Sequence, residues 1–360
     1  MKAAVCRAFG EPLTIEDIEI ADPQLNELKI KISAVAICHS DIHYAEGAWG
    51  GPLPAVYGHE AAGIVEKVGP GVKDLQQGDF VVITLIRACG HCYHCARGNR
   101  TICEHEFSRD GSGALSTPDG APVEQSMKTG AFAEYVLVDR SQVAKIPSDI
   151  PRESASLLGC GVITGLGAVT NTAKIPARCS VAVIGTGGVG LNSIQGARLA
   201  GARTIVAMDL VESKRKTALD FGATHAVDPS ANDAKEQVLA ATDGRGADYV
   251  FVTVGATRAY QQSISFLAPG GSVVYVGMPA VGETIDIEPL NIAGYGQSIR
   301  GSLMGSTHVQ QDIPALADLY RQGRLKLDEL VSNTYPLDRI NEAIAEVKKG
   351  EVLRNVIVFD

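Results

Sequence analysis

The stretch SVAVIGTGGVGLNSIQGARLAGARTIVAMDL, residues 180–210, determines the fold of one half of the chain. It begins with an apolar run, passes through a glycine-rich turn and a helical segment, and ends in a second apolar run. Two apolar strands joined by a helix form the βαβ unit of a parallel sheet, whose strands are buried on both faces. The stretch therefore predicts a doubly wound, parallel-sheet domain.

The glycine-rich turn has the spacing that binds dinucleotides. Gly185, Gly187 and Gly190 stand in G-x-G-x-x-G order, and Gly188 and Val189 complete the turn. The first glycine permits a tight turn, the second lets the backbone approach a pyrophosphate, and the third lets helix and strand pack closely. The N–H groups at the helix start can bind the anion. We expect a Rossmann nucleotide site here, since the flanking strands and helix are also present.

An acidic residue follows at the distance expected for a ribose contact. Asp209 ends the second apolar run. Its carboxylate would accept hydrogen bonds from the adenosine ribose and repel a 2′-phosphate, which favours NAD over NADP. Lys214 and Arg215 stand nearby and weaken that preference. A helix cap is the alternative role for Asp209.

The alternation of apolar runs and helical stretches continues towards the C-terminus. Strand-like runs recur at 249–255, 272–277 and 298–303, with helical stretches between them at 214–223 and 234–244. We expect this NAD-binding Rossmann domain to cover residues 162–303. The last stretch has helices that end in a β-like run, so it should pack back onto the N-terminal part.

The first third of the chain has a different pattern of apolar residues. Short β-like runs at 2–8, 28–37, 61–69, 79–86 and 131–138 are separated by glycine, proline and aspartate. This pattern predicts a mostly antiparallel, barrel-like domain over residues 1–161 and 304–360. Residues 104–130 are polar and poor in apolar side chains, so we expect a long surface loop there.

Length and charge limit the classes of function. A chain of 360 residues exceeds what one core usually serves, which favours two domains. The net charge of −9 is spread along the chain and would repel phosphate backbones, so nucleic acid is not expected as a partner. We see no secretory signal and no membrane span, and the expected location is the cytoplasm, where thiols stay reduced.

Four cysteines crowd into residues 89–103. Cys89, Cys92, Cys95 and Cys103 follow a C-x2-C-x2-C-x7-C pattern. Four thiolates that converge from one loop form the closed tetrahedral set of structural zinc. Three histidines of this region, His91, His94 and His105, could compete as ligands, but they are interpreted as exposed loop residues because four sulfurs already fill the tetrahedron.

Three other residues could build an open zinc site. Cys38, His59 and Cys160 lie far apart in sequence. Two sulfurs and one imidazole leave the fourth position of zinc for water or substrate. Taken singly, each residue is better explained as a buried thiol or a satisfied core histidine.

A resemblance supports the metal interpretation. The segments CHSD (38–41), GHE (58–60), the four-cysteine loop, GAFAEY (130–135), GCG (159–161), GTGGVG (185–190) and LRNVIVF (353–359) occur in this order over nearly the whole chain. In these motifs the chain resembles the zinc-dependent medium-chain alcohol dehydrogenases, in their long-loop, two-zinc, NAD-dependent branch. The resemblance implies a GroES-like catalytic domain beside the Rossmann domain.

The resemblance also implies roles at the metal. Cys38, His59 and Cys160 would bind a catalytic zinc, with Glu60 just behind the metal. Asp41 would hydrogen-bond His59 and hold its orientation. With the structural zinc, the chain would carry two zinc ions.

The implied reaction passes hydride from an alcohol to the nicotinamide. Zinc would acidify the alcohol oxygen. The proton would then leave through Ser40, the cofactor ribose and His43 to solvent. Simple hydrogen bonding by Ser40 and a surface position for His43 are the alternatives.

The remaining implied contacts concern cofactor and substrate. His39 and Arg354 would meet the pyrophosphate, and Thr164 would pack on the nicotinamide. Backbone groups of Val276, Ser302 and Met304 would meet its carboxamide. An apolar substrate pocket would be lined by five residues: Trp49, Leu85, Phe132, Met278 and Leu303. Plain core packing is the alternative for this set.

Other functions stay open at this point. A related branch acts on S-(hydroxymethyl)glutathione, but Trp49 and Phe107 stand where its acidic residue and arginine would be, and Arg109 is displaced. A zinc-free quinone reductase or a non-catalytic dinucleotide-binding protein is the alternative from another class. The resemblance further implies a homodimer, with a tetramer also possible, paired through the edge of the cofactor-domain sheet around residues 272–290.

Overall fold

The computed structural model describes residues 1–110 and 113–360 as two compact units. Unit 1 comprises Met1–Gly161 and His308–Asp360, and unit 2 comprises Val162–Thr307. The chain thus returns to unit 1 at His308 rather than at residue 304. The reason is local: Gly305 packs so closely on Gly167 that a Cβ on Gly305 would lie 2.9 Å from the Gly167 Cα.

Unit 2 is built on one parallel sheet. Its strands are β12 (Ser180–Ile184), β13 (Thr204–Met208), β14 (His225–Val227), β15 (Ala247–Val252), β16 (Leu267–Tyr275) and β17 (Ser298–Gly301). Their order is β14-β13-β12-β15-β16-β17, and every pairing in it is parallel. The prediction of a doubly wound sheet is confirmed.

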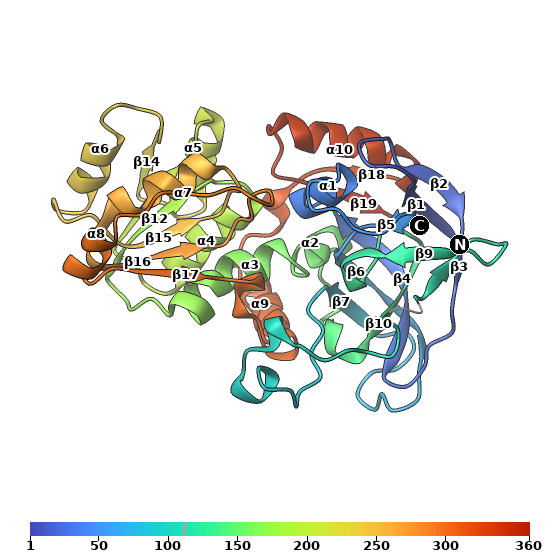
Figure 1. The fold of residues 1–360 in the computed structure, drawn as a ribbon. Coiled ribbons are helices and arrows are strands. Elements are labelled where there is room, and N and C mark those ends of the chain that lie inside the picture. Colours follow the sequence, from blue (N-terminus) through green and yellow to red (C-terminus); the bar gives the residue numbers. More distant parts are fainter. Residues whose placement is uncertain (111–112) are drawn as a thin grey trace. The chain divides into compact units, whose positions relative to one another are not determined.

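Helices flank this sheet, as Figure 1 shows. They are α3 (Gly161–Gly167), α4 (Gly188–Leu199), α5 (Glu212–Asp220), α6 (Ala234–Ala241), α7 (Thr257–Ser263) and α8 (Pro289–Gly294), with a π-helix at Ala168–Ala173. Val238 of α6 and Tyr260 of α7 join alternate strand residues such as Ile184 and Val206 in one apolar core. Because side chains alternate along a strand, Val181 and Val183 face the other side of the sheet.

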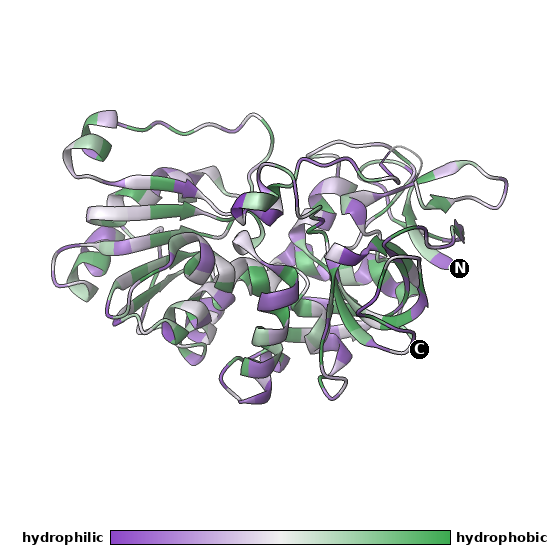
Figure 2. Ribbon diagram, turned by 90° about the horizontal axis from the view of Figure 1, so that it is seen from below, coloured by the Kyte–Doolittle hydropathy of each residue, from purple (hydrophilic) through white to green (hydrophobic). Residues whose placement is uncertain are grey.

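Unit 1 is a mostly antiparallel β structure. Its strands are β1 (Lys2–Cys6), β2 (Thr14–Asp17), β3 (Glu19–Ile20), β4 (Glu27–Ala36), β5 (Ala55–Val56), β6 (Glu60–Val68), β7 (Phe80–Thr84), β8 (Leu115–Ser116), β9 (Pro122–Gln125), β10 (Tyr135–Asp139), β11 (Val143–Lys145), β18 (Val331–Tyr335) and β19 (Arg354–Val358). One sheet runs β2-β1-β5-β9-β8-β3, and the other runs β11-β7-β6-β4-β19-β18 with β10 also paired to β4. Figure 2 shows that these strands are largely apolar.

The C-terminal segment completes this unit. It contributes α9 (Val309–Arg321) and α10 (Ile340–Lys349), which join α1 (His39–Ala45) and α2 (Arg152–Leu157) from the N-terminal part of the unit. The terminal strand β19 pairs antiparallel with β4, which confirms that the chain end packs back onto the first domain. Buried Ile340 and Val347 of α10 join the apolar core of the unit, because they lie on one face of the helix.

Two expectations need correction. The segment 104–130 is not a plain surface loop, since β8 and β9 lie in it and β9 pairs with β5. Arg109 anchors the segment, with its Nε 3.0 Å from Glu27 Oε1. The expected dimer segment 272–290 also does not form the edge of the sheet, because its β16 part is an inner strand and β17 forms that edge, while pairing of two copies there stays a prediction.

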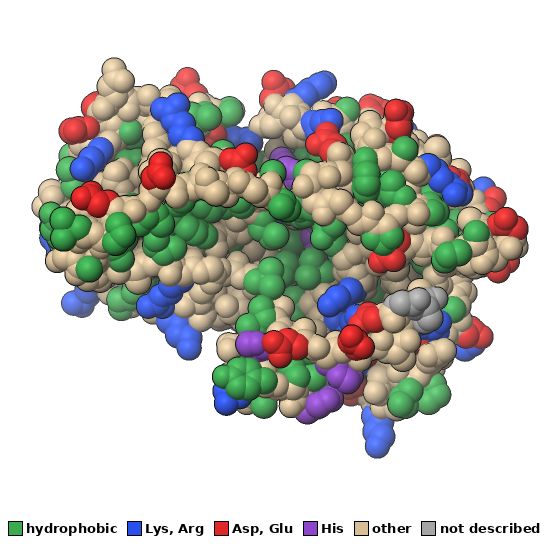
Figure 3. Space-filling model, in the orientation of Figure 1, with side chains coloured by type: hydrophobic (Ala, Val, Ile, Leu, Met, Phe, Trp, Pro, Cys, Tyr) green, Lys and Arg blue, Asp and Glu red, His purple; other side chains and the backbone are tan. Residues whose placement is uncertain are grey.

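The surface is chemically mixed. Figure 3 shows positive and negative side chains interspersed over the face in view. Among the helices of the described residues, none has the length and apolar character that crossing a membrane would take.

Candidate metal centres and dinucleotide site

Unit 1 brings together the two cysteines and the histidine that lie far apart in sequence. One ligand atom each of Cys38, His59 and Cys160 lies within 4.8 Å of the others. His59 Nε2 is 3.3 Å from Cys160 Sγ. All three side chains are buried, with His59 fully so. Two sulfurs and an imidazole nitrogen at this spacing fit one zinc ion with its fourth position open.

Two glycines allow Cys160 to reach this cluster. A Cβ on Gly159 would lie 2.5 Å from the carbonyl oxygen of Ile83, and one on Gly161 would lie 2.4 Å from an Arg354 nitrogen. A side chain at Gly159 would push the segment away from β6 and β7, and one at Gly161 would displace the Arg354 guanidinium. The GCG sequence is therefore a requirement of close packing around the cysteine.

Asp41 ties the other two residues of the cluster together. Its Oδ1 lies 3.0 Å from His59 Nδ1 and accepts the Gly58 N–H at 2.9 Å. Its Oδ2 accepts the Cys38 N–H at 3.0 Å, where α1 begins. Because the carboxylate can only accept, it holds the proton of His59 on Nδ1 and leaves the Nε2 lone pair for a metal.

The charges of the cluster favour a cation. The hydrogen bond with Cys160 lowers the pKa of the Cys38 thiol, and the same contact raises the pKa of Cys160. Of the two sulfurs, Cys38 Sγ is thus the one that loses its proton more readily to form a thiolate. Burial alone would lower the pKa of His59, but Asp41 outweighs it and raises that pKa.

Glu60 and Arg354 form a buried pair beside the cluster. Glu60 Oε1 accepts the Gly161 N–H at 3.1 Å, and Oε2 lies 3.9 Å from Arg354 Nη1. Within the described residues Glu60 Oε2 has no hydrogen-bond partner, and burial raises the pKa of this carboxyl to about 7. Glu60 is not part of the set of ligand atoms within 4.8 Å, although the sequence placed it with the metal residues. An orphaned carboxylate oxygen this deep in the protein is a further sign that a cation belongs nearby.

Helix α1 carries the residues expected to move a proton. Ser40 Oγ lies 3.8 Å from Cys38 Sγ, and His43 is partly exposed one turn later. The His43 and Trp49 rings lie 5.1 Å apart. His39 is exposed at the helix start, and Arg354 Nη1 donates to Ile37 O at 3.3 Å. The distances place Ser40 next to the metal cluster, while the pyrophosphate roles of His39 and Arg354 stay predictions.

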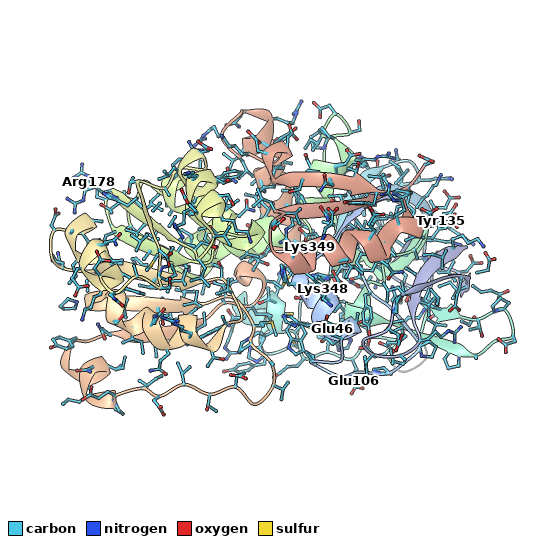
Figure 4. All side chains as sticks on the ribbon, turned by 90° about the horizontal axis from the view of Figure 1, so that it is seen from above. Glu46, Glu106, Tyr135, Arg178, Lys348 and Lys349 are labelled. Carbon is cyan, nitrogen blue, oxygen red and sulfur yellow. The ribbon has the colours of Figure 1, made fainter. Side chains whose placement is uncertain are left out.

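An ion pair fixes the end of α1 against α10. Lys348 Nζ lies 2.5 Å from Glu46 Oε1, directly after α1. Figure 4 labels both side chains, and they lie next to each other. The pair joins segments far apart in sequence and so helps to hold α1 in place.

The four cysteines of residues 89–103 also converge. Their sulfurs lie within 4.8 Å of one another. Backbone N–H groups point at the sulfurs: Cys92 N lies 3.3 Å from Cys89 Sγ, and Cys89 N lies 3.4 Å from Cys103 Sγ. Such bonds stabilise thiolates, and N–H groups of Cys95 and Glu104 lower the pKa of Cys92 to about 6. Four sulfurs in this arrangement fit a closed zinc site.

The histidines of this loop are not equivalent. His94 is partly buried and its Nε2 lies 3.1 Å from Glu104 Oε1, whereas His91 and His105 are exposed. The sequence interpretation treated all three as exposed loop residues. It missed that His91 and His105 lie within ligand distance of Cys89. The C-x-H step from Cys89 to His91 was the available signal, whereas His105 joins them only through the fold of the loop.

The glycine turn of unit 2 has the features of a phosphate site. Gly185 has φ +91°, a conformation that favours glycine. A Cβ on Gly190 would lie 1.8 Å from the Gly185 carbonyl oxygen, so a side chain there cannot fit. A Cβ on Gly187 would meet open space, and α4 begins at Gly188. The backbone N–H groups around Gly188 and Val189 are therefore accessible to an anion.

Asp209 lies against this turn. Its Oδ2 accepts the Thr186 N–H at 2.8 Å, and its Oδ1 accepts the Val211 N–H at 3.0 Å. A carboxylate oxygen has a second lone pair, so ribose hydroxyls can still bind. Arg215 contacts the Asp209 carbonyl at 2.7 Å, and Lys214 is partly exposed on α5.

The residues expected near the nicotinamide lie together in unit 2. Thr164 Oγ1 is 3.6 Å from Met304 Sδ, and both residues are buried. The N–H of Val276 bonds to Val252 O, and that of Ser302 bonds to Tyr275 O, both at 2.9 Å. If Val276 and Ser302 contact a carboxamide, they do so through other groups than their N–H.

The expected pocket residues differ in environment. Phe132 is fully buried in the apolar core of unit 1, since its backbone is bonded to Ala4 and Tyr57. Leu85 and Trp49 are partly buried. Met278 and Leu303 are exposed by 51% and 45% within unit 2. Phe132 therefore behaves as a core residue, as the packing alternative anticipated.

Comparisons with known proteins agree with this geometry. Residues 24–148 match the family described as alcohol dehydrogenase GroES-like domain, and residues 188–322 match the one described as zinc-binding dehydrogenase. The chain is 36% identical to an alcohol dehydrogenase class-P of Arabidopsis thaliana, over 99% of this chain and 97% of the relative. It is 37% identical to a probable S-(hydroxymethyl)glutathione dehydrogenase 1 of Schizosaccharomyces pombe, over 99% and 96%.

A solved structure shows the same fold. The benzyl alcohol dehydrogenase of Acinetobacter calcoaceticus superimposes with a TM-score of 0.93 at 33% identity, covering 100% of this chain and 99% of that one. The similarity thus extends over both units and both cysteine clusters.

Proposed function

Because the chain belongs to the zinc-dependent medium-chain alcohol dehydrogenase family, we propose that it transfers hydride reversibly between an apolar alcohol and NAD. Primary and secondary alcohols would give aldehydes and ketones. The observation that carries this proposal is the convergence of Cys38, His59 and Cys160 within 4.8 Å. A zinc ion bound there would supply a Lewis acid that acidifies an alcohol hydroxyl.

The chain's own residues would then manage orientation and the proton. Asp41 holds His59 in the tautomer that leaves Nε2 for the metal. Ser40, 3.8 Å from Cys38, would take the hydroxyl proton, and partly exposed His43 would release it to water. Apolar neighbours such as Leu85 and Trp49 would favour apolar substrates.

Replacing His43 by alanine tests the proton route. We expect alcohol oxidation to fall by about ten- to a hundredfold below neutral pH, towards the lower end of general acid–base effects. Added imidazole should restore part of the rate, because it can replace the missing base. A pH profile of kcat with and without imidazole measures this. An unchanged profile would exclude His43 from the route.

NAD is the proposed cofactor, with Asp209 as the discriminating residue. Asp209→Asn keeps an acceptor for Thr186 but removes the charge, so the preference for NAD over NADP should fall about tenfold, or about 1.4 kcal/mol. The ratio of kcat/KM values with the two cofactors measures it. Asp233→Asn is the matched control, since exposed Asp233 lies in the same unit and accepts a hydrogen bond from Gln237 instead.

Glutathione dependence distinguishes a second candidate. The similarity to the Schizosaccharomyces pombe relative, a probable S-(hydroxymethyl)glutathione dehydrogenase 1, supports S-(hydroxymethyl)glutathione as an alternative substrate for this chain. Against it, the Arg109 guanidinium is engaged by Glu27 and by the Asp22 carbonyl at 2.8 Å. A screen of benzylic, aliphatic and cinnamyl alcohols, and of formaldehyde with and without glutathione, decides between the two. Glutathione-dependent turnover alone would favour the second candidate.

Removal of zinc separates the alcohol dehydrogenase from the other class of function. A zinc-free quinone reductase or a non-catalytic dinucleotide-binding protein would behave identically before and after dialysis against a chelator. We propose two zinc ions per chain, so dialysis should abolish alcohol oxidation and zinc should restore it. Activity that survives complete zinc removal would contradict the proposal.

A homodimer is proposed for the assembled enzyme. Unit 2 exposes apolar side chains near its sheet edge, with Val281 exposed by 83% and Leu290 by 73%. Such a patch is typical of a protein interface. Val281→Asp combined with Leu290→Asp should convert dimers to monomers in light scattering after gel filtration, while Leu25→Asp on unit 1 should not. A wild-type mass four times that of one chain would contradict the dimer and show a tetramer.

We also propose a cytoplasmic location. All eight cysteines are free thiols, including those of the two clusters, which supports a reducing compartment.

A further inference from the structure

The outer side of the four-cysteine loop carries a second group of metal-ligating atoms. One ligand atom each of Cys89, His91 and His105 lies within 4.8 Å of the others. Both histidines are exposed and Cys89 is partly buried. One sulfur and two imidazoles are donors that favour zinc, copper or nickel over magnesium and calcium.

His91 is oriented for this role by its own backbone. Gly90 has φ +81°, and the turn folds the His91 ring back until its Nδ1 lies 3.0 Å from the Cys89 carbonyl oxygen. A carbonyl oxygen only accepts, so the ring proton is on Nδ1. The lone pair of Nε2 is then available to a metal, which is the usual arrangement of a ligand histidine.

His105 is held from its other side. Its ring meets the Phe107 ring edge-on, with centroids 5.1 Å apart and an interplanar angle of 74°. The Arg87 guanidinium covers Phe107 at 4.2 Å. The His91 and His105 rings are 5.1 Å apart at 68°, so they do not stack on each other. This edge-to-face contact places one ligand atom of each ring within 4.8 Å of the other and of Cys89.

The local charge suits a cation. Glu104 and Glu106 flank His105 and are exposed. Figure 3 shows surface histidines beside carboxylates in the lower part of the view, and Figure 4 shows Glu106 at the margin of the molecule. Negative side chains next to these imidazole donors favour a bound dication by Coulomb attraction.

We propose that Cys89, His91 and His105 form an auxiliary, solvent-accessible site for a borderline transition-metal dication. The site shares Cys89 with the four-cysteine set, because a thiolate sulfur keeps lone pairs after it binds one metal. Water completes the coordination on the exposed side. The site is separate from the cluster of Cys38, His59 and Cys160 and does not depend on turnover.

Nickel(II) titration of the zinc-loaded, full-length protein tests the proposal. We expect one nickel ion per chain and a sulfur-to-nickel charge-transfer band in the near ultraviolet. His91→Ala and His105→Ala should each weaken nickel binding by at least about tenfold, and the double variant should lose the band. His225→Ala, which removes an exposed histidine of unit 2, is the matched control.

Each outcome is decisive. Nickel binding that is equal in the wild type and the double variant would overturn the site. Nickel bound through the histidines without the charge-transfer band would overturn the sharing of Cys89. Circular dichroism and zinc content of the variants identify misfolding, which we do not expect because both side chains are exposed.

Discussion

Replacing Cys160 by alanine is expected to reduce alcohol oxidation by at least about a thousandfold, because the Lewis acid contributes several kcal/mol to the transition state. The variant loses one of the two sulfurs in the buried cluster and leaves His59 Nε2 without its neighbour at 3.3 Å. Zinc content should fall by one equivalent per chain. Steady-state kinetics and elemental analysis on the same preparation measure both quantities.

Cys179→Ala is the matched control for this experiment. Cys179 is also buried, and burial raises the pKa of its thiol to about 11, but it belongs to no ligand cluster. Its loss should leave zinc content and rate close to those of the wild type. If Cys160→Ala kept full activity with one zinc fewer, the catalytic role of the cluster would be wrong.

Replacing Cys103 by alanine is expected to act on stability. Structural zinc contributes about 10–16 kcal/mol in isolated zinc-finger peptides, and Cys103 is one of four sulfurs that would hold it here. We expect the free energy of unfolding to fall by more than about 4 kcal/mol, an exceptional value for one substitution. Urea unfolding followed by fluorescence measures it, and proteolysis within residues 89–110 should increase.

Cys6→Ala controls for the loss of a cysteine as such. Cys6 is fully buried in the core of unit 1, and its removal should cost about 1 kcal/mol. A Cys103→Ala protein with the stability and zinc content of the wild type would exclude the structural zinc site. The catalytic cluster should keep its zinc in either variant, so the two sites are tested separately.

Local patterns in the sequence were sufficient for several features. The glycine turn between two apolar runs predicted the βαβ unit, since its three glycines are needed within one short turn. The four cysteines predicted their own convergence, because short spacings restrict how far the sulfurs can separate. The C-terminal β-like run also pairs with β4, as expected.

Other features depended on contacts between distant segments. The prediction of a surface loop over residues 104–130 was wrong because β9 pairs with β5 and Arg109 bonds to Glu27. Both partners lie outside the segment, so the segment alone does not indicate them. The pocket role of Phe132 stays a prediction, and its burial in the core of unit 1 depends on backbone bonds to Ala4 and Tyr57, which are distant in sequence. His91 and His105 were set aside as ligands because four sulfurs fill one tetrahedron, and only the folded loop shows that both lie within ligand distance of Cys89.

The sequence by itself determined the sheet class of each half, the dinucleotide turn and the four-sulfur loop, since each is encoded within a few dozen adjacent residues. Only the tertiary structure decided that Cys38, His59 and Cys160 meet, and that Glu60 keeps an oxygen without a hydrogen bond beside Arg354. That meeting depends on the register of β4 and β6 and on the close approach allowed by Gly159 and Gly161. Such register arises from packing across the whole unit, which no single stretch of chain specifies.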